Sequence, residues 1–151
     1  MKKIIIALDY EPAAEKVADE GYALAKKLGA EVMLLHVVAE PAYYSNLEYS
    51  PVMGFAGFGG PDILEAEINL KEEAQRFLIN SRSHLGDESI NTSVVEGDFS
   101  EAILDAIKEF DADLLVMGTH SRRGFEKLLV GNLAAKMLNV ITIPLLAIPT
   151  N

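Results

Sequence analysis

The stretch Ile4-Ile5-Ile6-Ala7-Leu8 opens an alternation of apolar runs and helical patterns that decides the fold. An uninterrupted aliphatic run of this length is typical of a strand that is covered on both faces. Pro12 then stands where the first turn of a helix accepts a proline, and the apolar face of that helix runs to Leu28, before Gly29. Residues 31–38 carry a second apolar run and predict a second strand.

The same alternation continues to the end of the chain. The patterns predict helices over 63–85, 99–110 and 125–138, and strands over 90–96, 114–117 and 143–148. Strands separated by helices need crossover connections, which make a sheet parallel and cover both of its faces. We therefore predict a single domain over residues 1–151, a three-layer α/β/α fold of Rossmann-like type with a five-stranded parallel sheet. The strand order expected for it is 3-2-1-4-5.

A sheet of this kind binds ligands outside the carboxyl ends of its strands, at the point where the strand order reverses. For the order 3-2-1-4-5 this point lies between the first and fourth strands. The segments expected there are Asp9-Tyr10-Glu11 and Gly118-Thr119-His120-Ser121.

The amino-acid composition excludes several kinds of site and of binding protein. The 151 residues include 13 Lys and Arg against 23 Asp and Glu, a formal net charge of −10, and no cysteine. Without cysteine there are no disulfides, no thiolate zinc sites and no cysteine nucleophile. The negative charge argues against a nonspecific nucleic-acid binder and against a protein held on anionic membranes. No targeting segment or run of about 20 apolar residues is evident, so a cytoplasmic location is expected.

The connection over residues 39–61 differs from the rest in composition. It combines glycines with tyrosines and phenylalanines, and connections of this length are usually functional or mobile. Two interpretations remain open: a lid over the point where the strand order reverses, or an ordered arm whose aromatic side chains pack on the domain or on a partner.

The segment after the fourth predicted strand offers a candidate phosphate site. Small residues before a helix leave backbone N–H groups free at the positive end of the helix dipole, and Arg122 and Arg123 add local positive charge. Gly131 is unusual inside a helical pattern. Either the main helix begins near Gly131, with Asn132 as its N-cap, or the backbone approaches another group closely there. The alternative for the whole segment is a glycine-rich turn with solvated arginines.

Several segments together resemble the universal stress protein family of the UspA type. The carrying segments are residues 4–9, residues 30–37, Glu96-Gly97-Asp98 with Ile103-Leu104, and residues 115–124 through Leu129-Val130-Gly131-Asn132 to 143–146. The resemblance covers nearly the full length apart from residues 39–61.

The resemblance implies a site for ATP or a related adenine nucleotide. ATP-binding members share the pattern Gly-x2-Gly-x9-Gly-Ser/Thr, in which Gly118 and Gly131 occupy the first and third positions. Ser121 replaces the second glycine and Asn132 replaces the final hydroxyl residue. Serine adopts positive φ less freely than glycine, whereas asparagine can still donate a hydrogen bond to phosphate.

Three further residues match family positions near the base and ribose. Asp9 matches an acidic residue at the end of the first strand, and Val37 and Met117 match strand-end residues that line the adenine pocket. The alternatives are helix capping for Asp9 and ordinary core packing for the two apolar residues. The complete set of predicted nucleotide contacts is Asp9, Val37, Met117, Gly118, Thr119, His120, Ser121, Arg122, Arg123, Gly131 and Asn132.

The expected function is therefore that of a nucleotide-responsive stress or signalling protein. Similarity to the family implies a homodimer that pairs through the last strand, where Pro144 suits an edge or a strand start. The alternative is a dimeric interaction protein of the same fold with no nucleotide. A phosphoacceptor receiver domain is disfavoured, since the third strand ends in Glu96-Gly97 and the fifth in Ile148-Pro149 rather than in Asp and Lys.

The sequence gives little support for a catalytic site. Residues 118–127 do not supply a Walker A loop, and no Gly-x-Ser-x-Gly elbow is present. His120 adjoins Ser121, but no third residue is identifiable to orient the imidazole. The histidines His36, His84 and His120 lack the spacing of metal ligands and are interpreted as structural or exposed. At most a slow ATPase is expected, with no catalytic residue and no metal ligand assigned.

Overall fold

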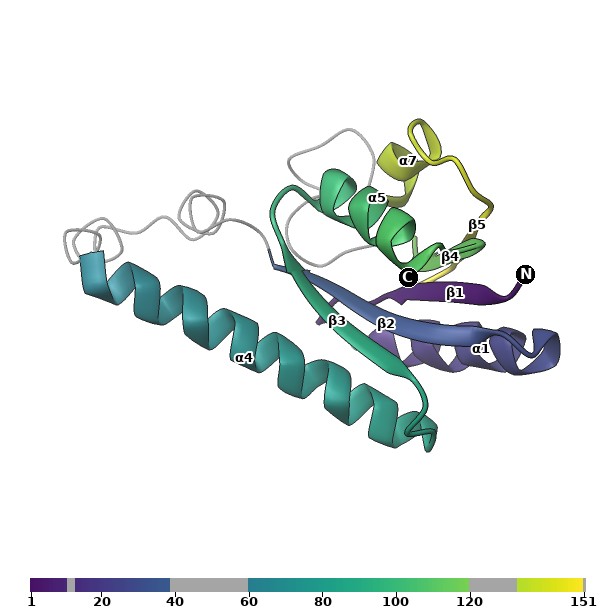
Figure 1. Ribbon diagram of the computed structural model, residues 1–151, viewed down its shortest axis with the longest axis horizontal. Helices are drawn as coiled ribbons and strands as arrows, with labels where there is room; N and C mark the ends of the chain where they lie inside the picture. The colour runs from purple at the N-terminus through teal and green to yellow at the C-terminus, as the bar shows by residue number, and fades with distance from the viewer. Residues whose placement is uncertain (11–12, 39–59, 120–132, 151) are drawn as a thin grey trace.

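The computed structural model describes residues 1–10, 13–38, 60–119 and 133–150 (Figure 1). Strands and helices alternate along this part of the chain, as the hydrophobic pattern predicts. The elements are β1 (Lys3–Ala7), α1 (Ala14–Leu28), β2 (Glu31–Val38), α4 (Gly60–Leu85), β3 (Asn91–Glu96), α5 (Phe99–Phe110), β4 (Leu114–Gly118), α7 (Leu133–Leu138) and β5 (Leu145–Ile148).

The five strands form one sheet in the order β3-β2-β1-β4-β5, and every neighbouring pair is parallel. Ile5 in the central strand pairs with Met33 of β2 and with Leu115 of β4. The predicted fold class and strand order are confirmed. The reversal of strand order lies between β1 and β4.

The three consecutive isoleucines of β1 explain why its sequence is uniformly apolar. Ile4 and Ile6 belong to the hydrophobic cluster beneath α1 and α4, whereas Ile5 belongs to the cluster beneath α5 and α7. All three are completely buried. Because successive side chains of a strand point to opposite faces, a central strand between two helical layers must be apolar at every position. Figure 1 shows these two helical layers on opposite faces of the sheet.

Boundaries differ from the sequence patterns by a few residues. α4 begins at Gly60 rather than at 63, and β5 begins at Leu145, directly after Pro144. Pro144 has no N–H to donate, but its carbonyl accepts a hydrogen bond from the backbone of Leu115. Of the helix predicted over 125–138, the structure describes the part that forms α7. Residues 125–132 lie outside the described part of the chain, as does Pro12.

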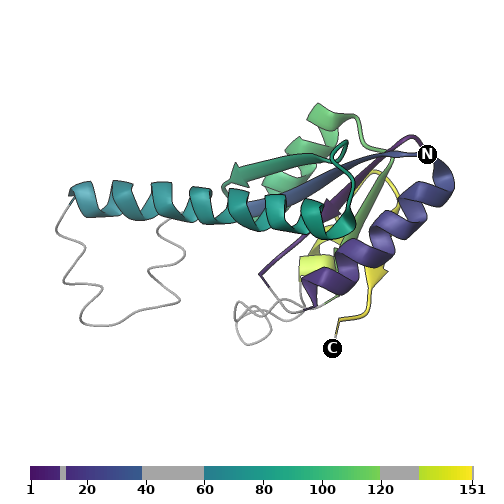
Figure 2. The same cartoon turned by 90° about the horizontal axis from the view of Figure 1, so that it is seen from below.

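α4 is the longest described helix, and only part of it covers the sheet. Figures 1 and 2 show its amino-terminal half extending past the sheet, while the carboxyl-terminal half lies beside β3 and α1. Ala74 and Leu78 of the packed half are completely buried. No helix among the described residues combines the length and apolarity that a membrane crossing requires.

Candidate functional site

The candidate site is the carboxyl edge of the sheet between β1 and β4. The Leu8 N–H donates to the Leu35 carbonyl at 2.8 Å, so hydrogen bonding between the first two strands continues past the end of β1. On the other side, the Thr119 N–H donates to the Ile148 carbonyl at 2.9 Å, and its Oγ1 accepts from the Thr150 N–H at 3.3 Å. Hydrogen bonds therefore continue past the strand ends on both sides of the reversal.

Val37 and Met117 are both buried at this edge. They lie in the cluster that packs against α5 and α7, so their side chains share one face of the sheet. Asp9 follows β1 at the same edge and is partly exposed, and its Oδ1 accepts a hydrogen bond from the Tyr10 N–H at 2.8 Å. The structure thus brings the three residues that the resemblance assigns to the base and ribose to one edge of the sheet.

Gly118 has a packing role that the sequence pattern did not reveal. A Cβ atom on Gly118 would lie 2.9 Å from Cγ2 of Thr150 and 3.2 Å from Cγ2 of Val17. Both separations are tighter than ordinary van der Waals contact, so β4, α1 and the carboxyl-terminal segment meet at a point that excludes a side chain. This packing disfavours a larger residue at 118 independently of any phosphate.

The remaining predicted contacts lie outside the described residues. They are His120, Ser121, Arg122, Arg123, Gly131 and Asn132. The same holds for residues 39–59, so the two interpretations of the aromatic connection stay open.

An aromatic cluster beside Asp9 was not predicted from the sequence. The Tyr10 ring lies 4.5 Å from the His36 ring and 4.9 Å from the Phe77 ring, centroid to centroid. The buried His36 places Nδ1 2.8 Å from the Leu8 carbonyl oxygen, and since a carbonyl only accepts, Nδ1 carries the proton. The interpretation of His36 as structural is confirmed. It ties β2 to the chain just before Asp9.

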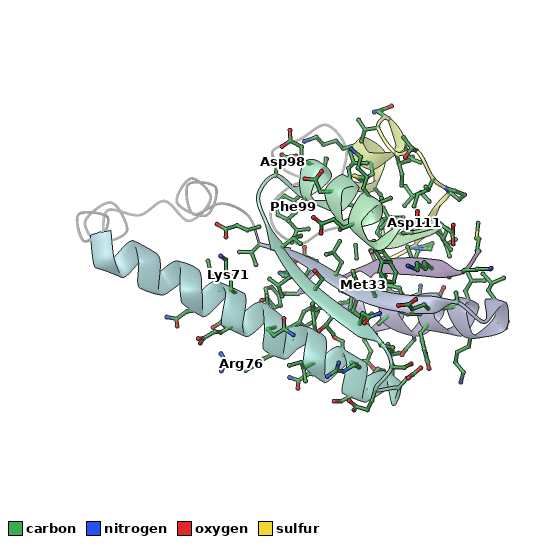
Figure 3. The ribbon with its side chains drawn as sticks, in the orientation of Figure 1. Met33, Lys71, Arg76, Asp98, Phe99 and Asp111 are labelled. Carbon is green, nitrogen blue, oxygen red and sulfur yellow. The ribbon has the colours of Figure 1, made fainter. Side chains whose placement is uncertain are left out.

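The end of β3 is less suited to an anion. Asp98, labelled in Figure 3 at the start of α5, caps that helix by accepting a hydrogen bond from the Glu101 N–H at 3.1 Å. Glu96 forms an ion pair with Lys71 of α4 at 2.7 Å. A carboxylate already occupies the positive end of the α5 dipole, so a phosphate would meet repulsion there. This favours the β1 and β4 ends as the ligand-binding part of the edge.

Comparisons with known proteins agree with this architecture. The sequence matches the Universal stress protein family over residues 1–149. It is 29% identical over 149 residues to a universal stress protein of Methanocaldococcus jannaschii, covering 97% of this chain and 81% of that protein. It is 26% identical over 148 residues to Universal stress protein A of Escherichia coli K12, covering 98% and 94%.

Solved structures show the same fold. Hypothetical protein MJ0577 superimposes with a TM-score of 0.73 at 24% identity, covering 99% of this chain and 96% of that one. A universal stress protein in complex with cAMP gives 0.64 at 17% identity, covering 99% and 98%. The universal stress protein from Archaeoglobus fulgidus in complex with dAMP gives 0.60 at 18% identity, covering 97% of both chains. With its sheet order, its buried central strand and a family match over nearly every residue, this chain belongs to the universal stress protein family.

Proposed function

We propose that this protein binds an adenine nucleotide, ATP or a close relative, at the carboxyl edge between β1 and β4 and acts in a stress response through the bound state. The observation that carries the proposal is the reversal of strand order at β1 and β4, with Asp9, Met117 and Thr119 at that edge. The complexes of two similar folds with cAMP and dAMP support the choice of adenine nucleotides.

Each predicted contact has a chemical role in this proposal. Val37 and Met117 present apolar surface to the base, and the Asp9 carboxylate accepts hydrogen bonds from ribose hydroxyls. Backbone N–H groups of the segment 118–132 bind the phosphates, together with Arg122 and Arg123. Positive charge in that segment offsets the net charge of −10, which would otherwise repel the ligand.

Calorimetric titration of ATP and AMP into the purified chain tests the proposal. Asp9→Asn keeps an oxygen that can accept from the Tyr10 N–H but removes the charge that faces the ribose. Hydrogen bonds to charged groups contribute about 1.5–3 kcal/mol, so we expect affinity to fall about tenfold or more. The matched control is Asp105→Asn on the exposed side of α5, which should leave affinity unchanged.

Restoring the family pattern gives the converse test. The double variant Ser121→Gly, Asn132→Ser should bind ATP more tightly than the parent chain, because glycine frees the backbone and serine supplies the expected hydroxyl. Gly118→Val is a poor probe, since its side chain would clash with Thr150 and Val17. If ATP and AMP at millimolar concentration release no heat and leave Tm unchanged in both the parent chain and the double variant, the proposal is wrong.

The second candidate function is that of a dimeric interaction protein without nucleotide. It is favoured by β5, which has one neighbour, β4, in the sheet of the described residues. In a parallel ladder alternate residues direct their backbone groups to the same side, and the carbonyls of Pro144 and Ile148 accept from the N–H groups of Leu115 and Thr119. The backbone groups of Leu145 and Ala147 therefore face outward, where a second copy of the chain could pair. We therefore propose that the chain forms a homodimer through β5 under either of the two candidate functions.

A further inference from the structure

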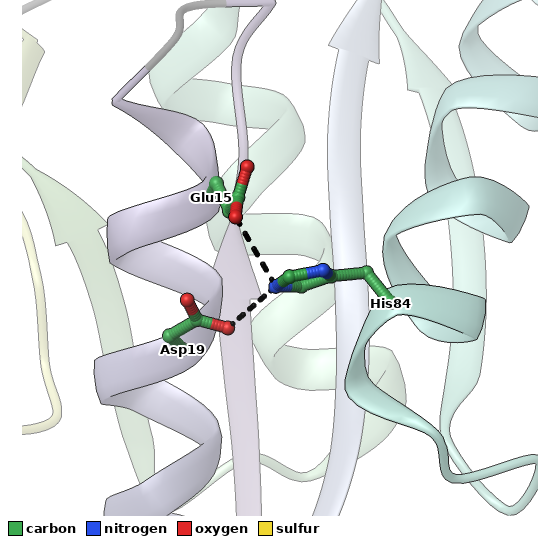
Figure 4. A group of neighbouring side chains, drawn as sticks. All are labelled: Glu15, Asp19 and His84. Atoms are coloured by element: carbon green, nitrogen blue, oxygen red, sulfur yellow. Dashed lines mark hydrogen bonds and ion pairs between the residues drawn. The ribbon is translucent and has the colours of Figure 1, made fainter.

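A histidine and two carboxylates meet between α1 and α4. Glu15 and Asp19 are four residues apart on α1 and so share one face of that helix. His84 belongs to the last turn of α4 and lies 65 residues from Asp19 in the sequence. Figure 4 shows its ring pointing between the two carboxylates.

Both carboxylates approach the same nitrogen atom of His84. His84 Nε2 lies 2.9 Å from Asp19 Oδ1 and 3.5 Å from Glu15 Oε1. One ligand atom from each residue lies within 4.8 Å of the other two. All three side chains are at least 45% exposed, so an ion and its remaining water ligands can reach them.

We propose that Glu15, Asp19 and His84 form a binding site for a divalent transition-metal ion such as Zn²⁺. Two ligands bound at about 2.1 Å and at the tetrahedral angle lie about 3.4 Å apart. The distance from Nε2 to the Glu15 oxygen already has this value, and the Asp19 oxygen must withdraw by about half an ångström. Water supplies the fourth ligand.

The donor set selects the class of ion. An imidazole nitrogen with two carboxylate oxygens suits Zn²⁺, Cu²⁺ and Ni²⁺, whereas Ca²⁺ requires six to eight oxygens and Mg²⁺ retains its waters. The ion binds the Nε2 lone pair in place of the hydrogen bond that His84 donates to Asp19 without metal, and the imidazole stays neutral with its proton on Nδ1. Two carboxylates with a neutral imidazole carry a charge of −2, which a divalent ion neutralises.

The surrounding structure holds the two helices in position before the ion binds. The Tyr22 hydroxyl of α1 donates to Asp87 Oδ2, just beyond α4, at 2.5 Å. Val17 and Ala18 of α1 and Leu78 of α4 lie in the same buried cluster. A bound ion therefore replaces the hydrogen bond between His84 and Asp19 as a link between helices that are already docked, and it stabilises the folded chain according to its concentration and affinity.

Titration of ZnSO₄ alone into the nucleotide-free chain tests the site, with calorimetry for stoichiometry and Co²⁺ absorption for coordination. We expect one ion per chain and a rise in Tm with Zn²⁺. His84→Gln should weaken binding at least tenfold and abolish the rise in Tm, and Glu15→Gln or Asp19→Asn should each weaken binding. Glu20→Gln, at an exposed position on the same helix, is the matched control and should bind Zn²⁺ as the parent does.

Three results would overturn the metal site. They are no stoichiometric Zn²⁺ binding by the parent chain, equal binding by His84→Gln, and equally tight binding of Mg²⁺ or Ca²⁺, which would indicate only an acidic surface. Far-UV circular dichroism of His84→Gln confirms that the variant is folded. ATP titration of the same variant separates this site from the nucleotide site, because its nucleotide affinity should match the parent.

Discussion

Asp113 joins the starts of β1 and β4 through a single carboxylate oxygen. Its Oδ2 accepts hydrogen bonds from the backbone N–H groups of Lys2 at 2.7 Å and Lys3 at 3.0 Å. These two hydrogen bonds hold the pKa of the Asp113 carboxyl below its ordinary value. The same residue donates its own N–H to the Lys3 carbonyl at 2.7 Å, so backbone and side chain act on one strand end.

The lowered pKa of Asp113 predicts a pH dependence of stability. Folding favours the ionised form, so this contribution is complete above the unfolded pKa of about 3.9 and disappears as pH falls through the lower folded pKa. Asp113→Asn should lower the free energy of unfolding at neutral pH and flatten its decline below about pH 4. Urea unfolding across that pH range measures both effects. If Asp105→Asn, an exposed control, flattens the decline equally, the assignment to Asp113 is wrong.

The histidines His36 and His84 show how much of a residue's role can be inferred from its type and its spacing in the sequence. Scattered spacing led to the interpretation of His36 and His84 as structural or exposed, and the structure agrees that one is buried and the other exposed. The lack of metal-ligand spacing nevertheless missed the grouping of His84 with Glu15 and Asp19. Spacing rules detect ligands that share an element, whereas these ligands come from two helices.

At the level of elements, Gly21 sets the approach of α1 to the sheet. A Cβ atom there would lie 2.9 Å from Ile6 Cδ1, 3.1 Å from Ile6 Cγ1 and 3.2 Å from Val116 Cγ1. Glycine lowers intrinsic helix stability, but here it allows the helix backbone to lie directly on β1 and β4. Gly21 lies on the buried face of α1, and the contacts of the folded chain give the reason for a glycine there.

Gly21→Val should therefore push α1 away from the sheet. Inserting side-chain atoms into a packed core costs about 1–3 kcal/mol, which we expect to exceed any gain from replacing glycine in a helix. The free energy of unfolding in urea gives the measurement. Glu20→Val, the same new side chain at the neighbouring exposed position, controls for the poor helix propensity of valine. Equal losses in the two variants would contradict the steric explanation.

For the whole molecule, the proposed homodimer depends on the outer edge of β5. Ala147 is exposed and its N–H faces away from β4, so Ala147→Pro removes an outward donor without removing a hydrogen bond between β4 and β5. We expect the dimer Kd to rise at least tenfold, with a shift toward monomer in sedimentation equilibrium. Ala147→Ser keeps the N–H and should dimerise as the parent does. A parent chain that sediments as a monomer, or a dimer unaffected by proline, would refute pairing through β5.

The resemblance of several segments indicated the family. The apolar patterns of the sequence determined the order of elements, the parallel sheet and its two covered faces. These properties follow from local patterns, because period-2 and period-3.6 apolar spacing records which side of each element is buried. The sequence also located the edge of the sheet at which Asp9, Val37 and Met117 lie, since the order of a parallel sheet places its carboxyl ends together.

Only the tertiary structure decided which side chains from separate elements touch. The group of Glu15, Asp19 and His84, the rings of Tyr10, His36 and Phe77, and the space that excludes a side chain at Gly118 depend on how each helix is rotated and how closely it approaches the sheet. Periodicity specifies the buried face of an element but not the neighbour that the face will meet. That choice is made by side-chain shape when the layers pack together.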